Sequence, residues 1–255
     1  MHAAKPSPPP AAAALTQLQR RGPIETAAEH LIGRLPIVRR PGSVILAPEG
    51  SAQDPVIVAK GWAARAKYLP DGRRQILTVI LPGDALSLNL TSRPIERCEL
   101  ISLTPIELLD AHMVREQLGH LPLLARALWL SQRDEEQRLI DQVGRLGRRT
   151  AMARICSLLL EFRDRMIAAG LGDRQRFEMP LTQEAVADVT ALSVVHVNRT
   201  LQQLRSQNLL EVRNGQARFN EPQEIEAIVG TPGPRRTEPT DQRQSNTAVS
   251  DDAPK

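Results

Sequence analysis

Cysteine is nearly absent: the 255-residue sequence contains only Cys98 and Cys156, which lie far apart along the chain. Two isolated cysteines provide neither a disulfide framework nor the Cys-x-x-Cys spacing of zinc and iron–sulfur sites. The simpler interpretation of each is a small, buried apolar residue. The sequence therefore predicts no metal site and no iron–sulfur cluster.

Long hydrophobic runs are absent as well. No segment approaches the roughly 20 apolar residues that span a bilayer, and the N-terminal stretch is too rich in proline for the core of a secretory signal. With 41% hydrophobic and 24% charged residues, the composition also excludes collagen-like, coiled-coil-array and wholly disordered chains. We expect a cytoplasmic, globular protein that has no membrane partner.

The sequence has little excess charge of either sign. Its 33 Lys and Arg residues are nearly balanced by 29 Asp and Glu residues, which leaves a net charge of +4. An excess this small cannot coat long stretches of nucleic acid, so any nucleic-acid role must come from a local basic patch. The sequence also shows no Ser/His/Asp set, no metal-ligand spacing and no phosphate-binding loop, and its carboxylates are scattered. We therefore expect no enzyme and no catalytic residues.

Composition and periodicity divide the chain into five segments. The two ends are dominated by Pro, Ala, Ser, Thr and Gln, which offer little to offset the entropy of ordering, and are predicted to be disordered tails. Between residues 35 and 109, short strands alternate with turns such as Pro70–Gly72 and Pro82–Asp84, a pattern that favours a small β-roll or barrel. The predicted segments are 1–22 (tail), 23–120 (β domain), 121–146 (long helix), 147–230 (C-terminal domain) and 231–255 (tail).

A long helix is predicted after Gly119, because Pro122 is tolerated in a first helical turn and Gly144 and Gly147 indicate a hinge beyond about Val143. Its roughly 22 residues span about 33 Å, which is more than one small β domain needs. Positions that step by fours and threes form a coiled-coil seam, although some of them are polar. We interpret the seam as a two-fold dimer interface; the alternative is a helix packed on its own β domain. The seam residues are Leu121, Ala125, Leu128, Gln132, Glu135, Leu139, Gln142 and Leu146.

Residues 181–204 carry the most informative pattern. Thr182 and Ser193 are each suited to cap the start of a short helix, and only about three residues separate the two helices. Two short helices joined by such a tight corner form a helix-turn-helix, with the small Ala187 where they approach most closely.

The second of these helices is amphipathic. Apolar residues at spacings of about 3 and 4 are predicted to face the core, and the opposite side is polar and contains no acidic residue. Such a face suits a major groove, where Arg pairs with guanine and Asn or Gln with adenine; an ordinary surface helix would mix Glu with Lys and Arg. The core set is Val194, Val197, Leu201 and Leu204, and the outer set is Val195, His196, Arg199, Gln202, Gln203 and Ser206, flanked by Asn198.

A hairpin follows directly. Asn214-Gly215 stands between two alternating segments, and a type I′ turn requires the positive φ that these residues adopt readily. A helix-turn-helix followed by such a hairpin is a winged helix. Residues 193–219 contain four arginines and one glutamate, so a net charge of +3 lies in the element expected to meet phosphate.

This order of β-roll, long helix and winged helix-turn-helix resembles the Crp/Fnr superfamily of bacterial transcription regulators over roughly residues 27–229. Gly61-Trp62, Leu69–Gln75 and Leu81–Asp84 are similar to the family's β-roll motifs, and Val195–Leu201 is similar to the recognition helix of one branch. The resemblance implies an α+β fold with an N-terminal cyclic-nucleotide-binding-like β-roll, a dimerisation helix and a C-terminal DNA-binding domain.

By position, the resemblance assigns Arg199 to guanine recognition in each half-site, and Ser193 and Gln183 to phosphate contacts. Val195 occupies the place of a base-reading Glu, so the half-site of the best-known members should not be assumed here. Ala191 replaces the usual turn glycine, which suggests slight strain or a different turn. The full set of predicted DNA-contacting residues is Thr182, Gln183, Ser193, Val195, His196, Asn198, Arg199, Gln202, Arg213 and Arg218.

The resemblance makes the Gly83–Asp84 turn a candidate effector pocket, together with Ser87 and Arg97. It also implies that nucleotide-binding members carry a ribose-binding Glu and an Arg-Ser-Ala phosphate segment. This chain has Leu88 in place of the Glu, and Glu99 stands near Arg97, where it would pair with the arginine or repel phosphate. We therefore expect no cyclic nucleotide.

Haem is left open as a cofactor, because His30, His112 and His120 are present, although a lone His is more often a surface or capping residue. Trp62 follows a glycine in a strand, and we interpret it as a core or interdomain packing residue rather than a ligand platform. No further cofactor is evident.

Two functional hypotheses follow. The first is a homodimeric regulator of transcription that places two recognition helices in successive major grooves of a pseudo-palindromic operator, with double-stranded DNA and RNA polymerase as partners. An effector of unknown identity at the β-roll, or simply protein abundance, would set the spacing of the helices. The second is a signalling module whose β-roll binds a small molecule or a protein and whose winged helix contacts protein. Steep weakening of binding with rising salt would favour the first hypothesis.

Overall fold

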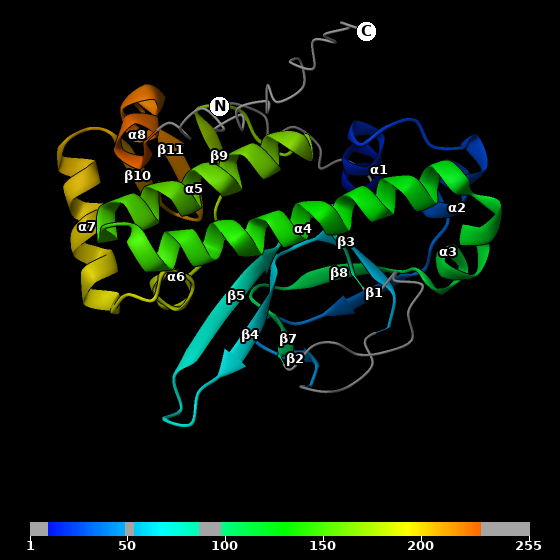
Figure 1. The fold of residues 1–255 in the computed structure, drawn as a ribbon, viewed down its shortest axis with the longest axis horizontal. Helices are drawn as coiled ribbons and strands as arrows, with labels where there is room; N and C mark the ends of the chain where they lie inside the picture. Colours follow the sequence, from blue (N-terminus) through cyan, green and yellow to red (C-terminus); the bar gives the residue numbers. More distant parts are fainter. Residues whose placement is uncertain (1–9, 49–53, 87–97, 231–255) are drawn as a thin grey trace, which may run out of the picture.

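The computed structural model describes residues 10–48, 54–86 and 98–230 (Figure 1). A long helix, α4 (Pro122–Arg148), runs the length of the molecule. The β-roll lies on one side of α4, and α5 (Ala151–Ala168) turns back along another side. The N-terminal helices gather at one end of α4, and the winged helix lies at the other end. The predicted α+β fold is confirmed.

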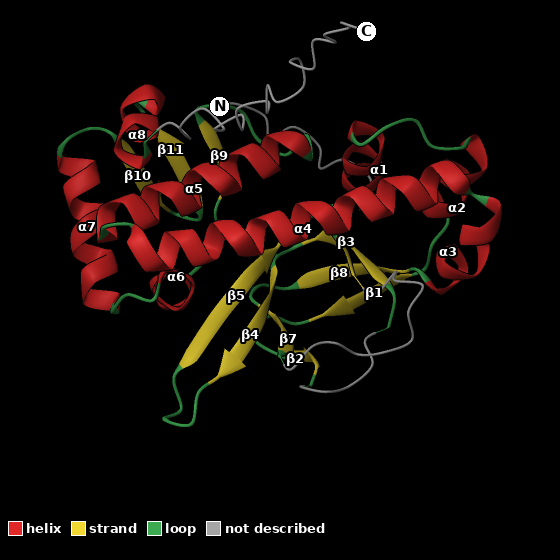
Figure 2. Ribbon diagram, in the orientation of Figure 1, coloured by secondary structure: helices red, strands yellow, loops and turns green. Residues whose placement is uncertain are grey.

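The β-roll consists of two four-stranded sheets, in the orders β1-β8-β3-β6 and β2-β7-β4-β5. Figure 2 shows these strands together on one side of α4, apart from the small sheet of the C-terminal region. Val58, Ala63, Leu100 and Leu108 belong to one buried apolar cluster of the roll. The strands are β1 (Ile37–Arg40), β2 (Ile45–Ala47), β3 (Val56–Lys60), β4 (Ala63–Tyr68), β5 (Arg74–Ile80), β6 (Ala85–Leu86), β7 (Glu99–Ser102) and β8 (Ile106–Asp110).

Part of the predicted N-terminal tail is ordered: Pro10–Arg20 forms helix α1, followed by α2 (Thr26–Gly33). Ala14 and Leu18 are buried in one apolar cluster with Ile57 of β3. The prediction of a disordered tail over 1–22 was wrong at these residues, because burial of one helix face offsets the entropy of ordering an alanine-rich segment. Residues 1–9 and the predicted tail 231–255 lie outside the described residues.

The start of α4 agrees with the sequence analysis. Helix α3 (His112–Gln117) passes into a 3₁₀ turn at Leu118–His120, and Pro122 occupies the first turn of α4. Proline is tolerated there because the first N–H groups of a helix have no partner within the helix.

The end of α4 differs from the prediction. The helix continues through Gly144 and Gly147, so the predicted hinge at these glycines is wrong. A glycine in a helix interior costs only about 1 kcal/mol, and the buried side chains of Gln142 and Arg145 anchor this stretch. The chain turns instead at Arg149, whose backbone is extended.

The C-terminal region is a winged helix. Helices α6 and α7 form the helix-turn-helix, and α5 and α8 pack behind them. A three-stranded sheet in the order β10-β11-β9 completes the unit. The elements are α6 (Gln183–Thr190), α7 (Val194–Ser206), α8 (Pro222–Val229), β9 (Arg176–Glu178), β10 (Leu210–Arg213) and β11 (Gln216–Phe219).

The β-roll and the winged helix share one apolar core. Trp62 of the roll meets Phe162 of α5 edge-to-face, with ring centroids 5.0 Å apart. Ile76 and Val79 of β5 join the same cluster as Val186 of α6. Trp62 is thus an interdomain packing residue. In the described ranges, no helix is long and apolar enough to cross a membrane.

Candidate nucleic-acid interface

Both helices of the helix-turn-helix begin at the predicted caps. The Thr182 hydroxyl accepts a hydrogen bond from the backbone N–H of Ala185 at 3.1 Å, and the Ser193 hydroxyl accepts one from His196 at 3.2 Å. Each cap satisfies a backbone donor that has no partner within its helix. The two side chains therefore fix where α6 and α7 start.

The turn between α6 and α7 contains a strained residue. Ala191 adopts the left-handed conformation, with φ 51° and ψ 43°, and the Leu192 N–H closes the turn on the Ala187 carbonyl at 3.2 Å. Left-handed backbone costs a residue with a Cβ about 1–2 kcal/mol. The strain expected from the replacement of the turn glycine is present, and α6 and α7 still meet at the tight corner.

The recognition helix α7 presents its predicted face to solvent. All six residues of the outer set and Asn198 are exposed, and Val195 is 72% exposed. On the inner side, Val197 and Leu204 are fully buried. Val194 was expected to face the core but is 40% exposed, because it lies in the first turn, where α7 has only begun to pack on α6. The polar face thus lies open to a partner.

The wing forms as predicted. Asn214 and Gly215 both have positive φ, 52° and 70°, and join β10 to β11 in register from Arg213–Gln216 to Leu210–Phe219. Arg213 and Arg218 are exposed.

One of the four arginines counted in this region is paired with an acidic residue of the same region. Arg205 at the end of α7 pairs with Glu211 of the wing at 3.3 Å. Within the described part of the chain, Arg199, Arg213 and Arg218 take part in no ion pair. Three exposed cations therefore remain for an anionic partner.

Polar contacts that the sequence analysis did not identify hold the helix-turn-helix in place. Gln142 of α4 donates from Nε2 to the Val189 carbonyl at 2.7 Å. From β5, Arg74 Nε donates to the Asp188 carboxylate at 2.8 Å, and Gln75 donates to the Asp188 carbonyl at 2.7 Å. The last turn of α6 is thus tied to both the long helix and the β-roll. These partners are distant in sequence, so no local pattern reveals them.

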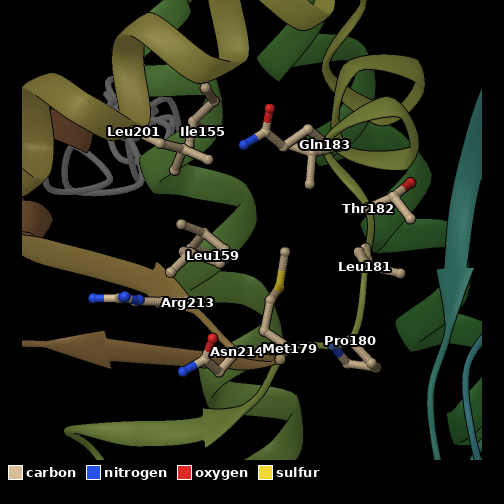
Figure 3. A pocket seen from close by; sticks show the side chains of 13 residues that line it. Ile155, Leu159, Met179, Pro180, Leu181, Thr182, Gln183, Leu201, Arg213 and Asn214 are labelled. Atoms are coloured by element: carbon tan, nitrogen blue, oxygen red, sulfur yellow. The ribbon is translucent and has the colours of Figure 1, made fainter.

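A pocket of about 300 Å³ lies between α5, α6, α7 and the wing turn. Figure 3 shows Gln183 and Met179 directed into it, opposite Leu159, while Arg213 points away. Thr182 and Asn214 also line the pocket. The start of α6 and the wing turn therefore lie on either side of one hollow, which Leu201 of α7 also lines.

The candidate effector turn already has protein partners. The Asp84 carboxylate accepts hydrogen bonds from the Leu81 N–H at 2.9 Å and from Arg165 of α5 at 2.5 Å, and Arg138 of α4 lies 4.0 Å away. Burial raises the pKa of Asp84, but the charges of Arg165 and Arg138, together with the hydrogen bond from the Leu81 N–H, hold this pKa below its usual range. Asp84 is therefore an ionised structural residue. Ser87 and Arg97, the other two residues of the predicted pocket, lie outside the described residues.

The space next to this turn is small. Between β5, β6 and α4, the described residues leave a cavity of about 10 Å³, lined by Thr78, Ser131, Glu135 and Arg138. A cavity of this size holds about one water molecule. Glu135 of α4 forms an ion pair with Arg65 of β4.

The predicted dimer seam is only partly available. Leu121 and Leu128 are buried in their own chain, with Ala125 packed against the same cluster, and Glu135 pairs with Arg65. Leu121 and Leu128 are therefore not available to a second copy, because this side of α4 packs on its own chain. Ala125, Gln132, Glu135 and Leu139 stay a prediction as dimer contacts. Gln132 and Leu139 are exposed.

A second apolar stripe of α4, rotated from the predicted seam and sharing Leu139 with it, faces solvent. Trp129 is 58% exposed, Ile140 59% and Val143 73%, and Leu139 lies next to them. Contiguous exposed apolar side chains of this size usually mark a surface that binds a partner.

The cysteines and histidines are in unremarkable positions. Cys98 and Cys156 are both buried and form no disulfide. Burial raises the pKa of the Cys156 thiol to about 12, so this thiol stays protonated near neutral pH. His30, His112 and His120 are exposed, and His112 Nδ1 lies 2.7 Å from Asp110.

A capped helix-turn-helix, an open recognition helix and a basic wing define a winged-helix DNA-binding protein. Comparison with known proteins agrees with this class: residues 153–228 match the Crp-like helix-turn-helix domain. The chain is 31% identical over 172 residues to the nitrogen fixation regulation protein FixK of Bradyrhizobium diazoefficiens, covering 67% of this chain and 72% of that one. It is 28% identical over 161 residues to the transcriptional activator protein FnrL of Cereibacter sphaeroides, covering 60% and 63%.

The fold agrees with the same relatives. The structure of FixK2 from Bradyrhizobium japonicum superposes with a TM-score of 0.66 at 26% identity, covering 77% of this chain and 98% of that one. The chain belongs to the Crp/Fnr superfamily of transcription regulators. It is a DNA-binding regulator of transcription rather than an enzyme.

Proposed function

We propose that the chain acts as a homodimer on a pseudo-palindromic DNA site, with one recognition helix in each half-site and no requirement for a cyclic nucleotide or other cofactor. The observation that carries this proposal is the exposed face of α7, which is polar and lacks acidic side chains. Regulators of this family bind DNA and work as dimers, and the family implies RNA polymerase as a further partner.

Base recognition falls to α7. Arg199 is exposed and takes part in no ion pair within the described residues, so its guanidinium is available for bidentate bonds to guanine O6 and N7. His196, Asn198 and Gln202 flank it and offer donors and acceptors for adjacent bases or backbone. Val195 offers an apolar contact, which suits a thymine methyl group.

Phosphate contacts surround this helix. The uncapped N–H groups in the first turns of α6 and α7 would meet an approaching DNA backbone, and Gln183 and Ser193 lie at these two helix starts. The wing adds the exposed cations Arg213 and Arg218. Phosphate contacts set the register of the protein on the duplex, while α7 reads the bases.

Dimerisation is assigned to the exposed stripe of α4, made of Trp129, Leu139, Ile140 and Val143. A two-fold axis along this helix would cover the stripe with the same stripe of a second copy. The two α7 helices would then face the same side of the DNA, one helical turn apart.

Three features of the β-roll support the part of the proposal that excludes a cyclic nucleotide. Asp84 is bonded to Arg165 rather than left open, the cavity beside α4 holds about one water, and the sequence has Leu88 in place of a ribose-binding Glu. A haem is not part of the proposal, since the three candidate histidines are surface residues.

The test is Arg199→Ala, measured by fluorescence anisotropy on a bound palindrome and on the same palindrome changed at each position in turn. We expect a loss of about 1–3 kcal/mol in binding free energy and relaxed preference at one base pair of each half-site. Arg205→Ala is the matched control, because Arg205 lies on the same helix but pairs with Glu211. Equal weakening on every DNA sequence would instead make Arg199 a phosphate contact, and salt-independent binding would favour a protein partner.

A further inference from the structure

Helix α1 occupies the space next to the Gly83–Asp84 turn. Gly83 has φ +93°, and a Cβ at this position would collide with the Gln17 side chain and lie 2.9 Å from the Ala13 carbonyl oxygen. Ala13 and Leu18 of the same helix are buried. The turn and α1 are therefore in close contact, which only a glycine at position 83 permits.

Gln17 connects α1 to the DNA-binding unit. Its side chain is only 7% exposed, and its Nε2 donates a hydrogen bond to the Arg165 carbonyl of α5 at 3.2 Å. The Arg165 guanidinium in turn bonds to Asp84 at 2.5 Å and to Glu161 at 3.1 Å. Helix α1, the turn of the β-roll and the last turns of α5 thus meet at one buried polar junction.

A second contact fixes α1 to the long helix. Arg21, just beyond the end of α1, donates from Nε to Asp134 of α4 at 2.9 Å, and its Nη1 donates to the Gln17 carbonyl at 2.7 Å. Helix α1 therefore spans the β-roll, α4 and α5. These are the three elements whose relative placement decides where the winged helix sits.

Movement of α5 would carry the recognition helix with it. Ile155, Leu159 and Phe162 of α5 lie in the same buried cluster as Val197 and Leu204 of α7. Helix α1 lies at the opposite end of the molecule from α7 (Figure 1), and every predicted DNA-contacting residue is exposed. The helix consequently acts on α7 through α5 and does not cover the DNA-facing surface.

We propose that α1 is an internal positioning element: through Gln17 it holds α5 against the Gly83–Asp84 turn, and so fixes the spacing of the two recognition helices in the dimer. The proposal rests on the proposed function, because spacing has meaning only for a dimer on a two-half-site operator. In this proposal, α1 itself keeps the winged helix in a fixed position relative to the β-roll and α4.

The test compares two palindromes, one with the preferred half-site spacing and one with a single base pair inserted between the half-sites. Insertion shifts and rotates one half-site, so a rigid dimer loses affinity steeply. Two variants remove the Gln17 donor: Gln17→Ala, and Gln17→Met, which keeps the length of the side chain beside Gly83. The control is Gln19→Ala on the same helix, because the exposed Gln19 side chain donates to Glu29 at 2.7 Å and, among the described residues, bonds neither to α5 nor to the Gly83–Asp84 turn.

Both Gln17 variants should lose about 3- to 10-fold in affinity at the preferred spacing, the effect of one hydrogen bond. They should also show a smaller penalty for the inserted base pair, with unchanged binding to random DNA, while Gln19→Ala matches the unmodified protein. Equal losses at both spacings with a lower melting temperature would make Gln17 a merely structural residue. Unchanged or tighter binding would also overturn the proposal. If the unmodified protein discriminates neither palindrome from random DNA, the proposed function itself fails.

Discussion

At the scale of single residues, Asp84 shows how a motif changes meaning with its surroundings. The Gly-Asp turn resembles an effector site, yet the Asp84 carboxylate is buried and bonded to Arg165, which lies 81 residues further along the chain. The pair joins the β-roll to the DNA-binding unit. A buried carboxylate of this kind is held ionised by its partners, and its charge contributes to stability only while it is ionised.

Asp84→Asn should lower the free energy of unfolding by about 1.5–3 kcal/mol at pH 7, because the Arg165 guanidinium loses a charged partner but keeps Glu161. The pKa of Asp84 is lower in the folded state than in the unfolded chain, so its contribution is fully present above the unfolded value of about 3.9. It is lost as the pH falls through the lower, folded value.

Urea unfolding of both proteins between pH 7 and pH 3 measures this difference. The gap in unfolding free energy between Asp84 and the Asn variant should be constant down to about pH 4 and shrink below it. A gap that stays constant throughout, or one that grows as the pH falls, would contradict the assignment.

Local chemistry made some residues predictable. Thr182 and Ser193 cap helices, and Asn214-Gly215 forms a turn, because each acts on backbone within a few residues of itself. Gln142 could not be predicted in this way. It fitted a heptad seam, but its partner is the carbonyl of Val189, 47 residues away.

At the scale of elements, α4 has two apolar faces, and the sequence pattern revealed the one that is used internally. Leu121 and Leu128 cover the chain's own core. The exposed stripe around Val143 is rotated about the helix axis from this seam. Polar residues interrupt the stripe, so its helical period is not evident in the sequence. The same limit explains α1, whose alanine-rich face has no pattern strong enough to identify burial before its partner in β3 is known.

Val143→Asp should convert the dimer to a monomer. An unpaired charge within a covered apolar stripe costs several kcal/mol, so the dimer dissociation constant should rise by about 100-fold or more. Sedimentation equilibrium measures this change. The control is Gln223→Asp, which adds the same charge at an exposed position of α8. A Val143→Asp protein that remains dimeric would place the interface elsewhere.

At the scale of the whole molecule, the β-roll and the winged helix pack on each other through a shared core. Their shared core contains Trp62 and Phe162, and polar bonds from Gln75 and Gln142 add to it. The sequence indicated the order of the domains correctly, but the contacts between them depend on residues far apart in the chain. Much of the small net positive charge of the chain is carried by the exposed arginines of α7 and the wing.

The central claim is that this chain recognises a two-fold symmetric DNA site through α7 without an added ligand. Its most direct test is the selection of bound sites from random double-stranded DNA by the purified full-length protein, with no effector present. The account predicts a pseudo-palindrome whose half-sites lie about one helical turn apart, with a guanine that loses its preference in Arg199→Ala. Random or asymmetric output under these conditions would contradict it.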